Sequence, residues 1–374
     1  MSIIASVTEK MTSHELTSKL KRFIPDLNQA ENYLKGDPEA VISKFLPVNK
    51  TGTLTEPSEL AIENKKRQIK PILEAGLRAL EKIRQNKENV NFDLQEKLAL
   101  CSIIVNIGRP AFLIQDGHFP QKGRDGQDGG LPPNWWILDD YREGIEKTCK
   151  SVGRIEHSDS ESSDVPGGTG FLIAKDIVIT NKHVVDYFAY NAGNMKWKIR
   201  KPTNPRIDYS EEYGSNENCE FAVKKIIGIH DTLDIALLKI KTKSSQGATL
   251  PDPLVLDSEL PEPTANRNVY VVGYPFQGSV EENPSDVRLV FNDLYGFKRL
   301  QPGKARGAEL QNFLIYHDCS TIEGNSGSCL VDLEKNKVIG LHFCGKLIQE
   351  LNEAVLLPLL KNDLLFEKAG VKFS

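Results

Sequence analysis

The chain has 374 residues, 39% of them hydrophobic, and its 51 Asp and Glu outnumber its 47 Lys and Arg for a formal net charge of −4. This length suits two ordinary domains, and the weak negative charge argues against a general nucleic-acid partner. No apolar run is long enough to cross a bilayer and no secretory signal opens the chain, so we expect no membrane partner and a cytoplasmic location.

The first 110 residues place their apolar side chains at the spacing of amphipathic helices. One face combines Ile69, Ile72, Leu73, Leu77, Leu80 and Ile83, and another combines Leu94, Leu98, Cys101 and Val105. Pro71 should either open the second part of the first helix or kink it. We expect residues 1–135 to form a mostly α-helical domain that regulates the rest of the chain or recruits a protein partner.

The helical pattern breaks between residues 110 and 136. Residues 121–130 are rich in Gly and polar side chains, which favours a mobile surface loop near 121–132. A last helix, over residues 136–150, would place Leu138, Tyr141, Ile145 and Cys149 on one side and link the two domains.

From residue 151 onward the chain has short apolar and β-branched runs separated by Gly, Pro, Asn and Asp. The clearest runs are residues 170–174, 177–180, 235–240, 269–273 and 338–342. Many short strands with close turns indicate a sandwich or a barrel. Residues 357–366 return to helical spacing and predict a short closing helix packed on that barrel.

Cofactor and metal sites are not expected. The six cysteines lack the Cys-x-x-Cys spacing of a zinc site, and free thiols are the simplest interpretation. The glycines of residues 167–170 precede a strand pattern, with no Lys-Ser/Thr after them, which excludes a phosphate-binding loop.

A serine in residues 321–328 is the candidate nucleophile. Ser326 is flanked by Asn325 and Gly327 and preceded by Gly324, a composition that suits a tight turn where backbone amides converge beside an exposed hydroxyl. Taken alone, the same residues favour a flexible loop.

A catalytic serine needs a base and a group that orients the base. His183 directly follows a predicted strand, and Asp234 opens an apolar one, where a buried carboxylate needs a partner such as a His N–H. Taken singly, each has a structural alternative: a core histidine and a strand cap. His230 and Asp231 precede the same strand, and we expect both to face solvent.

Four stretches together resemble the signature segments of trypsin-like (chymotrypsin-fold) serine peptidases, in that family's order. They are Gly168-Thr169-Gly170-Phe171, Thr180-Asn181-Lys182-His183-Val184-Val185, Asp234-Ile235-Ala236-Leu237-Leu238 and Gly324-Asn325-Ser326-Gly327-Ser328. The resemblance covers about residues 150–374 and implies an all-β double β-barrel of six strands each over residues 151–374. It also implies that His183 is the general base and then acid, Asp234 its orienting partner and Ser326 the nucleophile. The amides of Gly324 and Ser326 would form the oxyanion hole.

The residue before the nucleophile distinguishes branches of this family. The digestive and clotting branch has an acid there that pairs with a new N-terminus, whereas Asn325 carries no charge for that purpose. The bacterial branch of staphylococcal V8-type glutamyl endopeptidases is similar in sequence here and downstream. By that resemblance Thr321 and His342 face the substrate's P1 side chain and favour Glu or Asp, unless His342 is merely structural. Ser320 stands where trypsin has an Asp, so cleavage after Arg or Lys is not expected.

These observations predict a cytoplasmic, bacterial serine endopeptidase acting on protein or peptide substrates, with a helical N-terminal domain that serves regulation. The alternative is a peptidase-like barrel kept for binding, with little or no turnover. The complete set of His183, Asp234 and Ser326 favours the enzyme, because a barrel kept for binding has no physical need of all three.

Overall fold

The computed structural model divides into two compact units, described separately here. The first comprises Met1–Pro110, Pro120–Asp140 and Val280–Leu294, and the second comprises Ala111–Phe119, Tyr141–Ser279 and Tyr295–Ser374. The predicted boundaries near residues 135 and 150 stay a prediction. The residues that the structure describes are 12–24, 26–35, 59–85, 90–103, 108–121, 131–159, 164–193, 196–244, 246–276, 290–291, 294–344 and 351–374. Residues 122–130, most of the predicted surface loop, lie outside them.

The first unit is helical where it is described. Its elements are α2 (Ser13–Phe23), α3 (Leu27–Lys35), α5 (Glu59–Arg84), α6 (Leu94–Ile103), the 3₁₀ turn η2 (Pro133–Trp135) and α7 (Ile137–Asp140). A capping box begins α2, where Thr12 Oγ1 accepts from the Glu15 backbone N–H and the Glu15 carboxylate accepts from that of Thr12. No helix in the described residues is long and apolar enough to cross a membrane.

Apolar side chains from α2, α3, α5 and α6 form the core of this unit. Leu80 and Ile83, from the predicted stripe, are buried in it, and Leu73 and Leu77 pack against it. Pro71 lies inside α5, so it does not begin a second helix. The side chains of Ile69, Leu98 and Cys101, and all of Val105, lie outside the described residues.

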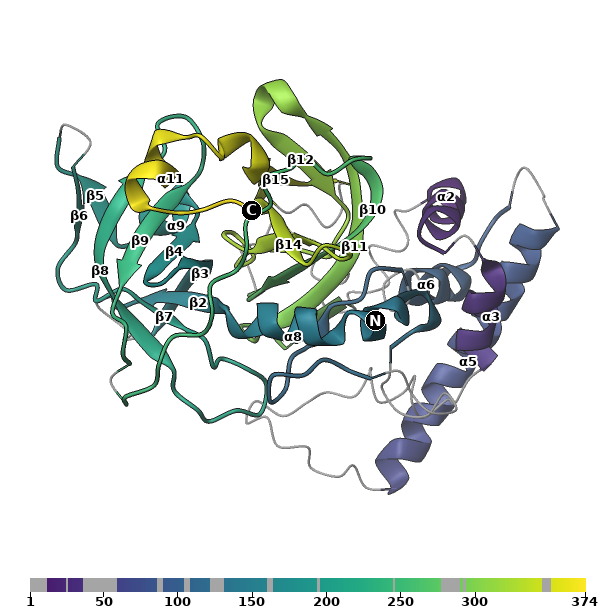
Figure 1. Cartoon of the computed structure of the whole chain (residues 1–374). Coiled ribbons are helices and arrows are strands. Elements are labelled where there is room, and N and C mark those ends of the chain that lie inside the picture. The colour runs from purple at the N-terminus through teal and green to yellow at the C-terminus, as the bar shows by residue number, and fades with distance from the viewer. Residues whose placement is uncertain are drawn as a thin grey trace. The chain divides into compact units, whose positions relative to one another are not determined.

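The second unit contains two closed barrels of six strands, drawn in teal and in green to yellow in Figure 1. The first barrel has the order β2-β3-β4-β9-β8-β7, and its apolar core holds Phe221 and Leu238, both nearly inaccessible to solvent. Its strands are β2 (Val152–His157), β3 (Val165–Ala174), β4 (Ile177–Thr180), β7 (Arg206–Asp208), β8 (Glu220–Ile229) and β9 (Ala236–Ile240). The short helix α9 (Lys182–Val185) follows β4, and β5 (Ala189–Asn191) pairs with β6 (Trp197–Ile199).

The second barrel has the order β11-β10-β13-β14-β15-β12, and pairing of β11 with β12 closes it. Its strands are β10 (Ala265–Gly273), β11 (Arg299–Glu309), β12 (Leu314–His317), β13 (Cys329–Asp332), β14 (Lys337–Cys344) and β15 (Asn352–Leu356), with η3 (Leu310–Asn312) between β11 and β12. The sequence prediction of an all-β double barrel is therefore confirmed, and each of the five clearest predicted strands falls on an observed one.

The single closing helix predicted over residues 357–366 is divided into the 3₁₀ helix η4 (Leu357–Leu360) and α11 (Leu364–Ala369). The predicted single helix over residues 136–150 is instead divided. Tyr141 interrupts it with a non-helical ψ of 13°, and α8 (Arg142–Lys150) follows.

An extra strand, β1 (Phe112–Leu113), joins the second barrel by pairing with β11. The backbone N–H of Ile114 donates to Lys298 O, and the buried Arg299 donates through Nη1 to Ala111 O. Residues 111–119 therefore belong to the same unit as the barrels, although the sequence offers no strand pattern there.

Candidate active site

Asp234 holds His183 by two atoms. Its Oδ2 lies 2.6 Å from His183 Nδ1, and its Oδ1 accepts from the His183 backbone N–H at 3.0 Å. Asn181, which caps α9, donates its side-chain amide to the Asp234 carbonyl at 2.8 Å. Because the carboxylate can only accept, the ring proton belongs on Nδ1, and Nε2 is left as the basic nitrogen.

The electrostatics of this pair favour an ionised carboxylate. Burial raises the pKa of Asp234, but the hydrogen bond and charge of His183, with the backbone N–H groups of Lys182 and His183, outweigh it, and the net pKa is lowered. The His183 side chain is 43% exposed and that of Asp234 27%, so the ring is accessible while its partner is more sheltered.

Ser326 lies in the turn between β12 and β13 of the second barrel, and two neighbouring glycines shape this turn. Gly324 and Gly327 have φ values of +88° and +87°. A Cβ on Gly327 would lie 1.9 Å from Thr169 O, and one on Gly324 would lie 2.3 Å from Tyr274 O. Both positions therefore require glycine for conformation and for space.

Thr169, on β3 of the first barrel, joins this turn to the His183 side of the site. Its N–H donates to Ser326 O at 2.8 Å, and its Oγ1 donates to Gly324 O at 2.7 Å. A Cβ on Gly168 would touch both Ser326 O and the Val184 side chain, the residue after His183. Ser326 and His183 thus lie on adjoining segments of the two barrels.

Two backbone N–H groups at the turn, those of Gly324 and Ser326, have no acceptor among the described residues. The preceding carbonyls are held: Phe276 N–H donates to Glu323 O, and Ser328 N–H donates to Asn325 O, both at 2.9 Å. In a trans peptide the N–H points opposite to the C=O, so each held carbonyl turns the following N–H away from its own partner. Ser326 itself is partly exposed beside these donors.

Ser326 differs from Asp234 in its relation to the His183 ring. No hydrogen bond joins Ser326 Oγ to the His183 ring in the part of the chain that the structure describes. Such bonds are commonly long in a free enzyme and shorten when substrate binds.

Thr321 and His342, the predicted specificity residues, are both buried. Thr321 Oγ1 has no hydrogen-bond partner in the structure. His342 Nδ1 lies 3.1 Å from Nε2 of His317, which is also buried, and the two rings meet edge to face. Burial holds the pKa of His342 well below its ordinary value, and the nearby His317 and His183 lower it further. His342 is therefore neutral at pH 7. His317 was not among the predicted site residues, because it belongs to no family signature.

The expectation that His230 faces solvent is wrong. Its side chain is only 15% exposed, and its Nδ1 accepts from the backbone N–H groups of Thr232 and Leu233. Its Nε2 lies 3.4 Å from Asp363, the N-cap of α11. His230 therefore stabilises the turn before Asp234. Asp231 is exposed as expected.

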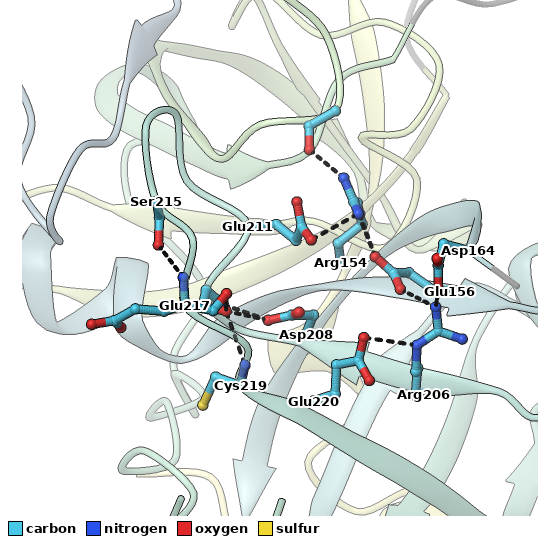
Figure 2. Close-up of polar contacts among 12 residues, drawn as sticks. Arg154, Glu156, Asp164, Arg206, Asp208, Glu211, Ser215, Glu217, Cys219 and Glu220 are labelled. Atoms are coloured by element: carbon cyan, nitrogen blue, oxygen red, sulfur yellow. Dashed lines mark hydrogen bonds and ion pairs between the residues drawn. The ribbon is translucent and has the colours of Figure 1, made fainter. Parts of the chain in front are cut away.

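Carboxylates of Glu156, Asp164 and Glu220 lie close enough together to share a cation. Arg206 supplies that charge: it bonds Glu156 at 2.6 Å and Glu220 at 3.1 Å, and contacts Asp164 (Figure 2). Arg154 pairs with Glu156 from the other side. The group is an ion-pair cluster that ties β2, β7 and β8, and nothing in it calls for a metal. Among the described cysteines, Cys149, Cys219 and Cys329 are free thiols.

The fold and the site together define a class, the double-barrel chymotrypsin-fold peptidases. Comparison with known families agrees, because residues 168–341 match the trypsin-like peptidase domain. The chain therefore carries a trypsin-like peptidase domain.

Individual relatives are more distant. Glutamyl endopeptidases of Staphylococcus aureus strains MW2 and MSSA476 are each 26% identical over 200 residues, covering 52% of this chain and 52% and 51% of theirs. The chain thus spans about half the length of these relatives. Among solved structures, the active form of the Rv3671c protease of Mycobacterium tuberculosis has a TM-score of 0.39 at 20% identity, covering 61% of this chain and 85% of its own. A serine endoprotease of Yersinia pestis has a TM-score of 0.42 at 16% identity, covering 61% and 67%.

Proposed function

We propose that this protein is a serine endopeptidase with Ser326 as nucleophile, His183 as general base and Asp234 as the group that orients the base. The observation that carries the proposal is the pair of contacts between Asp234 and His183. Asp234 Oδ2 lies 2.6 Å from His183 Nδ1 and Oδ1 lies 3.0 Å from the His183 backbone nitrogen, which leaves Nε2 as the basic nitrogen. The adjoining position of Ser326, held by Thr169, supports it.

The chemistry follows from these roles. His183 Nε2 takes the proton of Ser326 Oγ as the oxygen bonds to the scissile carbonyl carbon. His183 then gives that proton to the leaving amine, and the C–N bond breaks. Water attacks the acyl group by the reverse sequence, with the same histidine as base. Asp234 stays ionised throughout and stabilises the imidazolium.

The N–H groups of Gly324 and Ser326 would receive the negative charge that develops on the carbonyl oxygen. Their lack of an acceptor within the described residues, with the preceding carbonyls held, supports this role. A donor of this kind contributes about 2.7–4 kcal/mol to transition-state stabilisation.

An acidic P1 preference is proposed for the same site. Thr321 Oγ1 is buried and has no partner among the described residues, so it offers a hydrogen bond to an incoming group. If Nε2–H of His317 donates to Nδ1 of His342, then His342 carries its proton on Nε2 and can donate as well. A bound carboxylate would also raise the pKa of the neutral His342 and draw a proton to it. The staphylococcal relatives, named glutamyl endopeptidases, support the same preference.

Peptide-library profiling tests the P1 preference. Wild type should favour Glu or Asp at P1, and His342→Gln, which keeps one N–H donor but cannot become cationic, should lose most of that preference. Lys198→Gln is the matched control, since that side chain is exposed and lies on the separate β5-β6 hairpin. A library indifferent to P1 charge would contradict the proposal.

Regulation or recruitment by the N-terminal unit is proposed from its separate apolar core, which indicates a module of its own. Removing residues 1–108 retains β1, which pairs with the barrel, and should alter kinetics or co-purifying partners. Unchanged kinetics together with unchanged partners would refute this role. The free thiols and the bacterial relatives support a bacterial cytoplasmic location, which cell fractionation tests.

Hydrolysis of a protein substrate, compared between wild type and Ser326→Ala, separates the enzyme from a binding barrel without turnover. Ser258→Ala is the control, because no hydrogen bond involves that hydroxyl in the described chain. We expect hydrolysis by wild type and by the control and none by Ser326→Ala. Equal rates in wild type and Ser326→Ala would refute the proposal.

A further inference from the structure

Asn325, the residue before the nucleophile, is fully buried and held on every polar side. Its backbone N–H and its Nδ2 both donate to Ile322 O, at 3.1 and 3.2 Å, and its carbonyl accepts from Ser328 N–H. Its Oδ1 accepts from Nε2 of Gln301 at 2.8 Å. Three of these bonds close the turn on itself, and Gln301 is the one partner from outside it.

The direction of each amide follows from the chemistry of its neighbour. Ile322 O can only accept, so Asn325 must present Nδ2 to it and turn Oδ1 the other way. Oδ1 can only accept, so Gln301 must present its NH₂ group. The contact is therefore a neutral hydrogen bond with one allowed orientation.

Gln301 is well placed to anchor this turn. It lies on β11, opposite Val271 of β10, and is fully buried. Gly273, further along β10, allows the close approach: a Cβ there would lie 2.6 Å from Asn325 Oδ1 and 2.0 Å from Ser328 Oγ. The barrel wall thus packs directly against the turn, and Gln301 is the wall side chain that hydrogen-bonds Asn325.

We propose that Gln301 is a positioning residue, which holds the Ser326 turn and its two N–H groups in place through Asn325. The link to those groups is direct, because Asn325 C=O belongs to the same peptide unit as Ser326 N–H. The anchor comes from within the barrel and uses no charge, so the turn is formed without an ammonium group to pair with it. This role rests on the proposed function of Ser326.

The first test replaces Gln301 by Met, which keeps the length and shape of the side chain but has no donor. Asn325 Oδ1 is then buried without a hydrogen-bond donor. The turn should rearrange to reduce this desolvation cost, and the peptide unit that carries the Ser326 N–H should rotate with it. We expect kcat to fall roughly 10- to 100-fold with KM little changed, because the two N–H groups act mainly on the transition state.

Tyr270→Phe is the matched control for lost stability. Tyr270 is likewise buried, on β10 of the same barrel. Its hydroxyl donates to Asn336 Oδ1 and lies 3.0 Å from Thr148 Oγ1, so removal of the hydroxyl also breaks buried hydrogen bonds. It should lower the melting temperature and leave kcat as in wild type. An equal fall of kcat in both variants would reduce Gln301 to a structural residue and overturn the proposal.

The second test is the pH profile of Gln301→Glu. A protonated carboxyl can donate to Asn325 Oδ1, whereas an ionised one cannot, and burial raises the pKa of the introduced group. The kcat of the variant should approach that of wild type at the acidic end of the active pH range. It should fall as the pH rises, whereas the kcat of wild type stays constant. A profile parallel to that of wild type would overturn the proposal.

Hydrogen exchange measured on the full-length chain separates the anchor from the activity. Gln301→Met should speed exchange in the peptide that covers residues 322–328 and leave the first barrel unchanged. Unchanged exchange in that peptide would overturn the anchor, even in an active enzyme. A wild type without Ser326-dependent hydrolysis would instead overturn the proposed function, and local exchange would still decide whether Gln301 holds the turn.

Discussion

Thr169 offers a sensitive test of how the two barrels build one site. Its Oγ1 donates to Gly324 O at 2.7 Å and accepts from Tyr274 N–H at 3.1 Å, and all three residues are buried. Thr169→Val keeps the shape and removes the hydroxyl, which leaves one carbonyl and one N–H unpaired. At about 1–3 kcal/mol for each buried group, the free energy of unfolding should fall by about 2–6 kcal/mol.

The same change should also lower the catalytic rate, because the Thr169 hydroxyl binds the carbonyl of Gly324, whose N–H is a proposed oxyanion donor. If the turn relaxes and the Gly324 N–H leaves its position, kcat should fall by about 10²–10³, the cost of one lost oxyanion donor. Urea unfolding and peptide hydrolysis measure the two effects, and Thr169→Ser, which keeps the hydroxyl, should recover most of both. A folded Thr169→Val with wild-type kcat, or a stability loss below about 0.5 kcal/mol, would show that the Thr169 hydroxyl does not hold the turn.

Three further predictions concern single residues. Asp234→Asn should lower kcat by about 10⁴ in steady-state hydrolysis, because the amide favours the wrong tautomer of His183; a tenfold effect would contradict the assigned role. His342 has a folded-state pKa below its ordinary 6.5, so its contribution to stability is complete above about pH 6.5 and is lost as the pH falls below it. His342→Gln should therefore flatten the acid side of the urea-unfolding profile, and an unchanged slope would contradict this. Gly273→Ala should lower the free energy of unfolding by about 1–3 kcal/mol, because the added methyl group overpacks against Ser328, and the melting temperature should fall. An unchanged melting temperature would show that β10 and Ser328 can move apart to accommodate the methyl group.

Local pattern was enough to predict the short strands, and the resemblance of four stretches to the trypsin-like peptidases predicted the double barrel and the residues that the structure brings together at the site. Strands such as β4 and β9 are short apolar runs between turn residues, and this signal is contained in the segment itself. His183 and Asp234 stood out by their place at the ends of those runs. The structure then brings them within 2.6 Å of each other, across 51 positions of sequence.

Features that depend on partners distant in sequence could not be predicted. β1 is only two residues long and exists because β11 accepts it as a neighbour. The sequence around Gln301 and Thr169 carries no signal of the hydrogen bonds that their side chains make. Their partners come close only in the folded barrels. The burial of His230 could not be predicted, because Asp363, which lies 3.4 Å from its Nε2, is more than a hundred residues further along the chain.

Labelling with a fluorophosphonate probe, followed by mass spectrometry of the modified peptide, tests whether Ser326 is an activated nucleophile. The probe forms a covalent bond only with a serine activated by its base, so the predicted result is one adduct on Ser326, absent from Ser326→Ala and strongly reduced in His183→Ala. An unlabelled wild type, or a label that persists in Ser326→Ala, would contradict the account.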